Sequence, residues 1–260
     1  MSVGPADAPF VIAHVSDLHF GAHAPAAADA LVDDVAAVAP GLVVVTGDCT
    51  MRARDRQFAQ ARALLDRLPA PRLVVTGNHD VPLLRPGRLL APYAGYRAWI
   101  DADLDPRLDL PHVRALGLQS MPRWRWKGGR VTRRQSALVA AYLGAAPAGA
   151  IRLLALHHPP SAGGPARIVG RAQLLRALAA AHVDLVLAGH THVPASHRLL
   201  DPATGHGPVE VVAGTATSRR LRGAPRSWNV IRVDAGHVHV EQRYEAGGAW
   251  RSGRTVTHER

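Results

Sequence analysis

The stretch FVIAHVSDLH, residues 10–19, runs from a short apolar segment directly into a cluster of polar residues. Four further stretches share this organisation, because each is a short apolar run that ends at a polar motif. These runs are residues 42–46, 73–76, 151–156 and 184–188. Short apolar runs bounded by turn residues are typical of buried strands. The sequence therefore predicts five strands that each end beside potential functional residues.

Segments with helical periodicity separate these strands. Apolar residues recur every three or four positions in residues 26–39, 55–68 and 171–181, and residues 132–143 form a further helix candidate. Strands that alternate with helices are typical of an α/β layered fold.

The remaining segments have weaker patterns. Residues 81–111 are rich in Pro, Leu and Arg, and we predict an irregular insertion over the sheet edge. After Val193, strand-like runs separated by turn residues predict antiparallel strands that close a second sheet. These runs are residues 195–200, 209–212, 228–233 and 237–244. We expect a short N-terminal extension (1–9), a single domain (10–246) and a polar, frayed C-terminal tail (247–260).

Composition limits the classes of function. The chain has 260 residues, enough for one large domain, and no apolar run reaches the roughly 18 to 20 residues that a membrane helix needs. Its first nine residues lack the features of a secretory signal, so we expect a cytoplasmic protein. The single cysteine, Cys49, excludes an internal disulfide and a cysteine-rich zinc site. The net charge of +11 favours anionic partners, although arginine spread along a chain also arises from base composition.

Five polar clusters follow the five predicted strands: SDLH (16–19), GDCT (47–50), GNHD (77–80), HHPP (157–160) and GHTH (189–192). Ligand sites of α/β sheets gather at such strand ends. The clusters supply imidazole, carboxylate and amide groups, which suit borderline divalent metals. The candidate metal ligands are Asp17, His19, Asp48, Asn78, His157, His190 and His192.

The spacing within two clusters supports convergence on one site. Asp17 and His19 are two residues apart, as are His190 and His192, and residues i and i+2 of an extended strand end point the same way. A single polar cluster is more often a hydrogen-bonded or capping group than a ligand. Five clusters in the same strand-end context favour a metal site.

The set D-x-H, G-D, G-N-H-D, H-H-P-P and G-H-T-H resembles the calcineurin-like metallophosphoesterase superfamily over residues 10–192. Gly47–Thr50 and the His157–Pro160 run most resemble the bacterial branch of class III cyclic nucleotide phosphodiesterases and glycerophosphodiesterases. The resemblance implies a four-layer α/β/β/α sandwich, with two mixed β-sheets flanked by helices. It also implies two divalent metal ions, which can be Fe, Mn or Zn.

The resemblance assigns a role to each candidate. The first metal would be held by Asp17, His19 and His192, and the second by Asn78, His157 and His190, with Asp48 bridging both. Two cations roughly 3.5 to 4 Å apart need a shared anion, and a bridging hydroxide would be the nucleophile. The resemblance also places His79 at the substrate, where it would stabilise the transition state or protonate the leaving group.

Several neighbouring residues have two interpretations. His158 lies beside the expected ligand His157 and is a pocket residue or simply packed. Asp80 either orients the His79 imidazole or caps a turn. Cys49 is interpreted as a small packed side chain. Met51 stands where many protein phosphatases of the superfamily have an aspartate, which argues against a protein phosphatase.

Basic and aromatic residues near these motifs are also ambiguous. Arg52 and Arg54 either clamp a phosphate or are solvated. The segment Trp124–Lys127 either forms a stacking surface for a nucleotide or, as we favour, holds tryptophans that anchor a loop to the core.

We predict a dinuclear metal-dependent phosphoester hydrolase, with a phosphodiesterase favoured over a monoesterase. Its substrate would be a small phosphoester such as a cyclic nucleotide or a glycerophosphodiester. One alternative is a nuclease of the same superfamily, which the basic charge favours, but no DNA-binding module is recognisable. The other is a non-catalytic scaffold, which the complete ligand set argues against. The sequence does not predict the oligomeric state.

Overall fold

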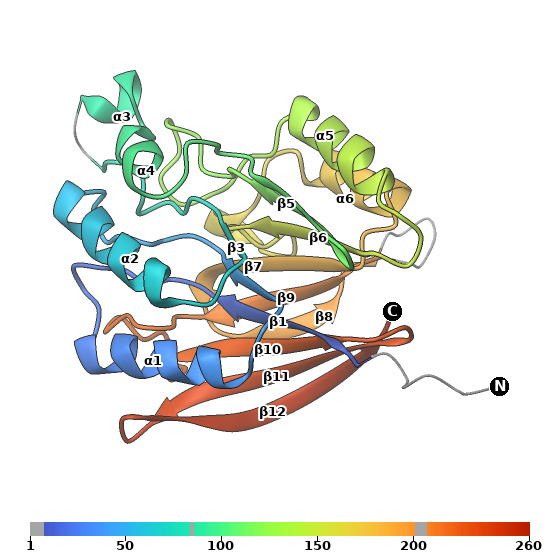
Figure 1. The fold of residues 1–260 in the computed structure, drawn as a ribbon. Helices are drawn as coiled ribbons and strands as arrows, with labels where there is room; N and C mark the ends of the chain where they lie inside the picture. The colour runs from blue at the N-terminus through green and yellow to red at the C-terminus, as the bar shows by residue number, and fades with distance from the viewer. Residues whose placement is uncertain (1–7, 84–85, 201–206) are drawn as a thin grey trace.

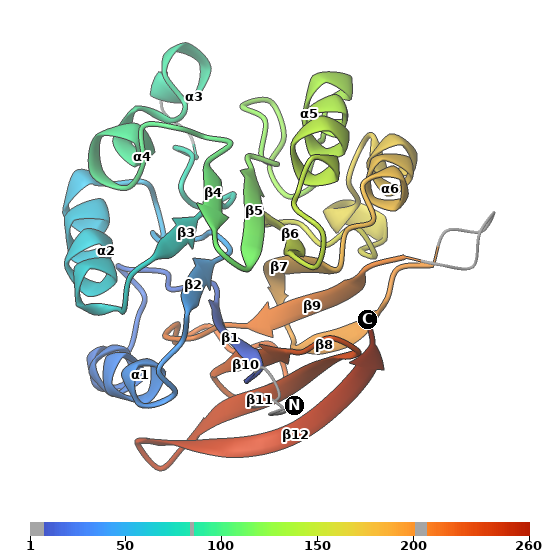
Figure 2. The same ribbon diagram turned by 45° about the vertical axis from the view of Figure 1, so that its right-hand side comes forward.

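The computed structural model describes residues 8–83, 86–200 and 207–260 (Figures 1 and 2). The N-terminal extension expected for residues 1–9 therefore lies, apart from its last two residues, outside the described residues. In the described part of the chain, no helix combines the length and the apolar character that crossing a bilayer requires.

Two six-stranded mixed sheets pack face to face (Figure 2). The first has the order β12-β11-β10-β1-β2-β3, in which β1, β2 and β3 are parallel and β10, β11 and β12 are antiparallel. Its strands are β1 (Phe10–Val15), β2 (Leu42–Val45), β3 (Arg72–Val74), β10 (Ser227–Val233), β11 (His237–Ala246) and β12 (Ala249–Glu259).

The second sheet has the order β4-β5-β6-β7-β9-β8. Its four central strands are parallel, and its two edge strands are antiparallel to their neighbours. Its strands are β4 (Arg107–Leu110), β5 (Val113–Leu118), β6 (Ile151–Leu156), β7 (Leu185–His192), β8 (Ala195–Arg198) and β9 (Val209–Gly214).

Helices cover the outer face of each sheet (Figure 1). The first sheet is covered by α1 (Pro25–Ala37) and α2 (Asp55–Arg67), and the second by α5 (Arg133–Gly144) and α6 (Arg171–Ala180). The start of α5 is fixed by a capping box in which the Thr132 side chain accepts a hydrogen bond from Gln135 N. This arrangement confirms the predicted four-layer α/β/β/α sandwich.

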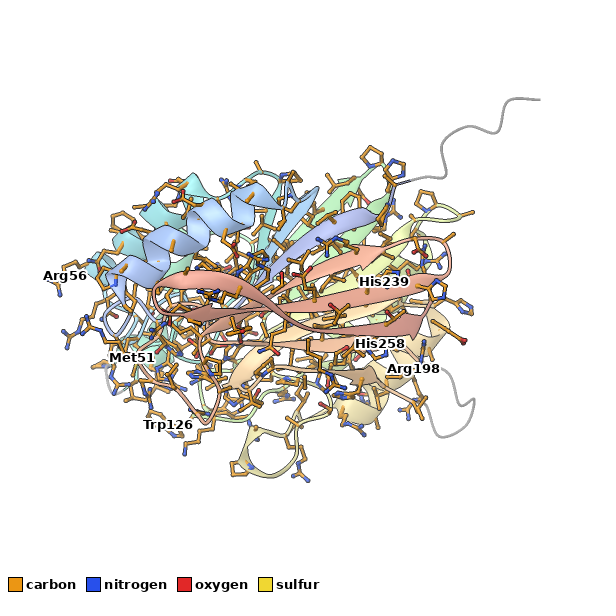
Figure 3. All side chains as sticks on the ribbon, turned by 90° about the horizontal axis from the view of Figure 1, so that it is seen from below. Met51, Arg56, Trp126, Arg198, His239 and His258 are labelled. Carbon is orange, nitrogen blue, oxygen red and sulfur yellow. The ribbon has the colours of Figure 1, made fainter. Side chains whose placement is uncertain are left out.

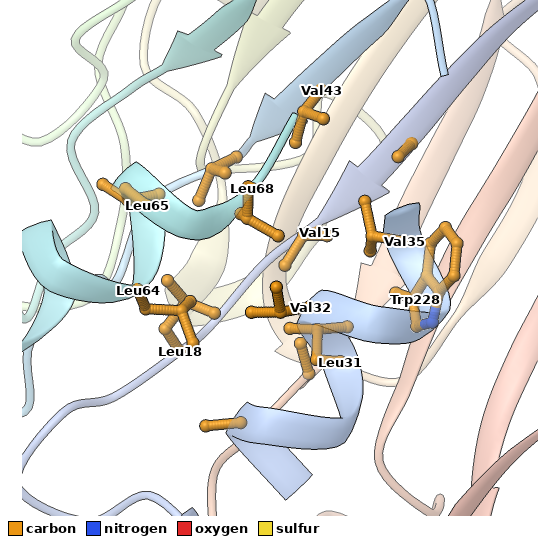
Figure 4. Packing of buried hydrophobic residues seen from close by; sticks show 14 of the residues in the cluster. Val15, Leu18, Leu31, Val32, Val35, Val43, Leu64, Leu65, Leu68 and Trp228 are labelled. Atoms are coloured by element: carbon orange, nitrogen blue, oxygen red, sulfur yellow. The ribbon is translucent and has the colours of Figure 1, made fainter. Parts of the chain in front are cut away.

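Each of the three layer interfaces has its own hydrophobic core. On β2, Val43 and Val45 pack toward α1 and α2, whereas Leu42 and Val44 pack toward the other sheet. The first core lies between the first sheet and helices α1 and α2. Figure 4 shows this core, in which Trp228 of β10 lies beside α1. A strand buried on both faces is apolar at every position, because each face loses contact with water. That is why the uninterrupted apolar runs predicted these strands correctly.

The insertion between β3 and β5 is more ordered than the sequence predicts. It contains the short helices α3 (Gly87–Leu90) and α4 (Ala94–Trp99), followed by β4. The Tyr96 hydroxyl donates a hydrogen bond to Val74 O, which ties α4 to the end of β3. A single helical turn contains too few residues to produce a readable periodicity.

The prediction for the C-terminal region was wrong in two respects. The four expected strands do not close one sheet, because β8 and β9 join the second sheet whereas β10 and β11 join the first. Residues 249–259 are not a frayed tail but the edge strand β12, which pairs with β11. Gly247 and Gly248 have φ of 63° and 83°, as a two-residue hairpin turn requires. The strand is polar because most of its side chains are exposed.

Candidate metal centre

All seven candidate ligands lie together at the end of the sandwich where β1, β2, β3, β6 and β7 terminate. The loops after β1, β2 and β3 carry Asp17, His19, Asp48 and Asn78 from the first sheet, whereas His157, His190 and His192 come from the second. The group therefore spans the seam between the two sheets.

Asp17, His19 and His192 form one group of donor atoms. Asp17 Oδ1 lies 3.1 Å from His192 Nε2 and 3.4 Å from His19 Nε2, and the two Nε2 atoms lie 3.0 Å apart. Asp17 and His19 are completely buried, and His192 is nearly so. These are the three residues assigned to the first metal by sequence resemblance.

Asn78, His157 and His190 form a second group. Asn78 Oδ1 lies 3.1 Å from His157 Nε2 and 2.9 Å from His190 Nδ1, and these two nitrogens are 3.2 Å apart. One amide oxygen and two imidazole nitrogens thus face one another across the seam. They are the residues assigned to the second metal.

Asp48 lies between the two groups. Its Oδ2 atom is 3.6 Å from His19 Nε2 and 3.5 Å from His157 Nε2, while its Oδ1 accepts a hydrogen bond of 2.8 Å from His79 N. Gly77 permits this placement, because a Cβ at that position would lie 2.1 Å from Asp48 Oδ1. One carboxylate therefore contacts both groups, as a bridging ligand must.

The donor atoms fit divalent cations. Nitrogen and oxygen ligands at about 2.0 to 2.2 Å from one ion lie about 3.0 to 3.6 Å from each other, which matches the separations within each group. Asp17 Oδ1 is buried without a hydrogen-bond donor. A buried polar atom without a partner is costly, and a bound cation would remove that cost.

Hydrogen bonds of the Nδ1 atoms orient two of the histidines. His157 Nδ1 lies 2.7 Å from Thr46 O, and His192 Nδ1 lies 2.9 Å from Arg220 O. A carbonyl oxygen only accepts, so each Nδ1 carries the proton and donates it. In the neutral imidazole each Nε2 then presents its lone pair to the cluster, which is the tautomer that a metal ligand needs.

The expectation that these residue pairs lie on extended strand ends was wrong, although their side chains do converge. Asp17, His19, Asp48, His190 and His192 have positive φ, between 50° and 71°, and are not extended. This left-handed region is unfavourable for residues with a Cβ, and such strain gathers at functional sites. A regular strand end would have placed each D-x-H or H-x-H pair on one face, whereas His190 and His192 contact different groups.

Burial and the charges within the site shift the pKa values of its side chains. Burial alone would raise the pKa of Asp48, but the charges of His157 and His79 hold it well below its usual range. Burial alone would lower the pKa of His157, but Asp48 raises it to about 9. Burial and the charge of His157 lower the pKa of His190 to about 4. These shifts keep the Asp48 carboxylate ionised and favour a protonated His157 without a metal, so metal binding would release the His157 proton.

His79 lies beside the first group, with a ring nitrogen within 4.8 Å of donor atoms of His19 and Asp48. Its Nδ1 donates to Met51 O at 2.9 Å, and its ring meets the His19 ring edge-on at a centroid distance of 4.8 Å. Burial lowers its pKa. The side chain lines the cavity over the centre, with Nε2 left for a ligand.

The ambiguous neighbours have structural roles. Asp80 accepts hydrogen bonds from Cys49 N, Thr50 N and Gly77 N, which ties the loops after β2 and β3 together. His158 is fully buried, with its Nδ1 2.8 Å from Ser120 Oγ. Cys49 packs in the first core, where burial raises the pKa of its thiol.

A cavity of about 490 Å³ lies over the centre. Four basic side chains line it, namely Arg52, Lys127, Arg220 and Arg222. Arg54, by contrast, is exposed at the start of α2 and does not line the cavity. Sequence reasoning missed Arg220 and Arg222, although the basic run at residues 219–222 was a readable signal. The cavity suits an anionic ligand.

Trp126 lines the same cavity and is 49 % exposed, so the expectation that the tryptophans anchor a loop to the core was wrong. The guanidinium of Arg88 lies 4.4 Å from the centroid of the Trp126 ring. Arg88 is buried and donates hydrogen bonds to the carbonyl oxygens of Pro82, Arg123 and Arg125. This buried arginine fixes an exposed aromatic ring at the cavity wall.

Comparisons with known proteins identify the family and the fold. The sequence profile of the calcineurin-like phosphoesterase family matches residues 10–194. No curated protein matched the chain in a sequence search.

Solved structures resemble the fold at low sequence identity. A purple acid phosphatase, PPD1, from yellow lupin (Lupinus luteus) matches 97% of this chain with a TM-score of 0.71 and 13% identity. This chain spans about half of that protein, 54% of its length. PhoD matches 99% of this chain and 71% of its own, with a TM-score of 0.71 and 13% identity. GAP50, the anchor in the inner membrane complex of Plasmodium, matches 97% of this chain and 89% of its own, with a TM-score of 0.62 and 12% identity.

Proposed function

Because the chain belongs to the calcineurin-like phosphoesterase family, we propose that it is a dinuclear metal-dependent phosphodiesterase. The observation that carries this proposal is the place of Asp48, within 3.6 Å of a donor atom in each of two three-residue groups. Mixed imidazole, carboxylate and amide donors suit Fe, Mn or Zn. The proposed ligands are Asp17, His19 and His192 for one ion, Asn78, His157 and His190 for the other, and Asp48 for both.

Two bound divalent cations would supply an activated water near neutral pH and would neutralise charge on the phosphoryl oxygens. The protein contributes the remaining chemistry. His79 faces the cavity through Nε2, where it can donate a proton to the departing ester oxygen. Its lowered pKa makes the imidazole a stronger proton donor once it is protonated.

We infer a preference for a diester because residues that lie beside each of the two groups line the cavity. Arg220 binds His192 through its carbonyl oxygen and so lies beside the first group. The loop that carries Trp126 and Lys127 lies beside the second group, since Gly129 packs so closely that a Cβ there would be 2.8 Å from His158 Cγ. Each of the two ester substituents would thus contact a different wall of the cavity.

The Trp126 wall favours a planar substituent. A fixed, half-exposed aromatic ring stacks on nucleobases with about 1 to 3 kcal/mol per base. Neighbouring Lys127 and Arg52 would balance the negative charge of a phosphate. We therefore favour a nucleotide-type diester, as in the cyclic nucleotide phosphodiesterases, over a glycerophosphodiester.

The proposal is tested by comparing bis(p-nitrophenyl) phosphate with p-nitrophenyl phosphate as substrates of purified protein whose metal content has been measured. Chelator-sensitive turnover that favours the diester, with about two metals bound per chain, is expected. Equal or greater turnover of the monoester would contradict the phosphodiesterase assignment. Turnover of neither ester despite bound metal, together with salt-dependent cleavage of DNA, would favour the nuclease alternative.

A further inference from the structure

A second cluster of metal-binding side chains lies outside the candidate centre, on the hairpin that joins β10 to β11. It consists of Asp234, His237 and His239. Figure 3 shows His239 on this hairpin, toward the opposite end of the molecule from Met51 and Trp126. We propose that these three side chains bind one exchangeable divalent ion of the Zn²⁺, Cu²⁺ or Ni²⁺ class, independently of the proposed phosphodiesterase centre.

The three donor atoms already face one another. One nitrogen from each histidine and one carboxylate oxygen all lie within 4.8 Å of one another. His239 Nε2 lies 3.2 Å from Asp234 Oδ2, and His237 Nδ1 lies 3.6 Å from Asp234 Oδ1. His237 and His239 alternate along β11, so their side chains leave the same face of the sheet. Adjacent ligands of a tetrahedral zinc ion lie about 3.4 Å apart, so small side-chain rotations complete the site.

Local hydrogen bonds hold two of the three side chains in place. Asp234 Oδ1 accepts hydrogen bonds of 2.9 Å from Gly236 N and 2.8 Å from His237 N, which fix the carboxylate in the turn. His239 Nδ1 lies 3.0 Å from Thr257 Oγ1 on β12. His239 Nε2 lies 3.2 Å from Asp234 Oδ2, so the ring is held between the Thr257 hydroxyl and the Asp234 carboxylate, and a bound cation would replace the proton between nitrogen and carboxylate.

The surrounding charges are compatible with a cation. Arg232 lies directly across from His239 on β10, but it is paired with Glu241 at 2.8 Å. Arg260 lies near the Asp234 carbonyl, and its Nε binds Asp184 Oδ1 at 2.9 Å. Glu259 stands directly across from His237 on β12 and adds a negative charge at this face. The nearest arginines are therefore already neutralised.

The donor atoms indicate which class of ion binds. The exposure of the three side chains indicates that the bound ion can exchange with solvent. Two imidazoles and one carboxylate favour zinc, copper and nickel over magnesium and calcium, which prefer oxygen. The side chains of Asp234, His237 and His239 are 35%, 53% and 36% exposed. Water therefore fills the remaining coordination positions, and the ion is exchangeable.

The test compares zinc binding by the full chain and by the double variant His237→Thr/His239→Thr, using equilibrium dialysis and calorimetry. Threonine has no imidazole and retains strand propensity. The matched control is His258→Thr, because His258 pairs with Val238 and lies on the opposite face of the same strands. The wild type and the control are expected to bind one zinc more than the double variant, or to bind it at least about tenfold more tightly.

Histidine NMR provides a second readout. Zinc is expected to shift the ring resonances of His237 and His239 in the wild type. Equal zinc stoichiometry and affinity in the double variant, or His237 and His239 resonances that respond to pH but not to zinc, would overturn the proposal and leave an ordinary ion pair. Hydrolysis of bis(p-nitrophenyl) phosphate is expected to be the same in all three proteins, so a failure of this site is distinguishable from a failure of the proposed function.

Discussion

His19 Nε2 and His192 Nε2 lie 3.0 Å apart, although 173 positions separate the two residues in the sequence. His192 Nδ1 donates to Arg220 O, so in the neutral imidazole His192 Nε2 is an acceptor. His19 follows β1 of the first sheet, and His192 ends β7 of the second. A cation held by both would cross-link the sheets, so metal binding and the stability of the seam are expected to be coupled.

Asp48 is the proposed bridge between the two ions. Asp48→Ala is expected to remove both metals and hydrolysis together, because this carboxylate contacts both groups of donors. Metal content by mass spectrometry and turnover of bis(p-nitrophenyl) phosphate check it. The control is Asp66→Ala, which removes an exposed carboxylate paired with Arg62. Retention of two metals and activity by Asp48→Ala would disprove the bridging assignment.

His79→Ala is expected to keep both metals and to lose about 10²- to 10⁴-fold in kcat, the usual effect of removing a general acid. The reason is that His79 is hydrogen-bonded to Met51 O and lines the cavity, whereas other residues are proposed to hold the two ions. Steady-state kinetics on metal-quantified protein measure the effect. Loss of metal in this variant would reassign His79 as a ligand, and an unchanged kcat would remove it from the mechanism.

Trp126→Ala is expected to raise KM for a cyclic nucleotide roughly 5- to 150-fold, which corresponds to about 1 to 3 kcal/mol of lost stacking. Trp126→Phe is expected to keep part of this binding energy. Turnover of glycerophosphoglycerol, whose substituents have neither a ring to stack nor a cation for a cation–π contact, serves as the comparison and should change little.

The matched control for this prediction is Trp124→Ala. Trp124 is also exposed, but it lines a separate cavity with Tyr93 and Arg130. Equal effects of the two substitutions on nucleotide binding would show that Trp126 is not a specific stacking platform.

His14 gives a prediction for the dependence of stability on pH. Burial lowers the pKa of His14 from 6.5 to about 3, against the opposing charge of Asp17. The unfolded chain then binds a proton between about pH 6.5 and pH 3 that the folded chain excludes. The free energy of unfolding should therefore fall by about 1.4 kcal/mol for each pH unit below 6.5 from this group alone.

The measurement is urea unfolding of the wild type and His14→Gln at pH 7, 6 and 5, in chelator. Glutamine cannot titrate, and its amide can replace the contact of His14 Nε2 with Thr46 Oγ1, which is 3.0 Å long. The difference between the two proteins should shrink or reverse as the pH falls. Parallel profiles would show that His14 is not excluded from protonation in the folded state.

The layered fold was predictable because its central strands are buried on both faces. Leu42 and Val44 serve one core while Val43 and Val45 serve another, so every position is apolar. The polar edge strand β12 carries no such signal, since its pairing partner β11 supplies most of its contacts. Burial, and not strand propensity, decides which strands can be recognised from a sequence.

The candidate site was predictable in its residues but not in its geometry. Residue types at strand ends identified all seven donors, because convergence depends on topology. The left-handed backbone at Asp17 and Asp48 was not readable, since the dihedral angle is imposed by tertiary contacts. The exposure of Trp126 could not be predicted from the sequence either, because it depends on a contact with Arg88, which lies 38 positions earlier in the sequence.

The position of β10 beside β1 has a consequence for how the chain matures during synthesis. β1 is made first, yet one of its edges pairs with β10, which begins at Ser227 (Figure 1). Trp228 of β10 then donates a hydrogen bond to Asp34 on α1 and closes the first core. A nascent chain that has released all seven donors, through His192, still has an open edge at β1. We expect a ribosome-bound chain to acquire protease resistance only after the β10–β12 ribbon has emerged and paired.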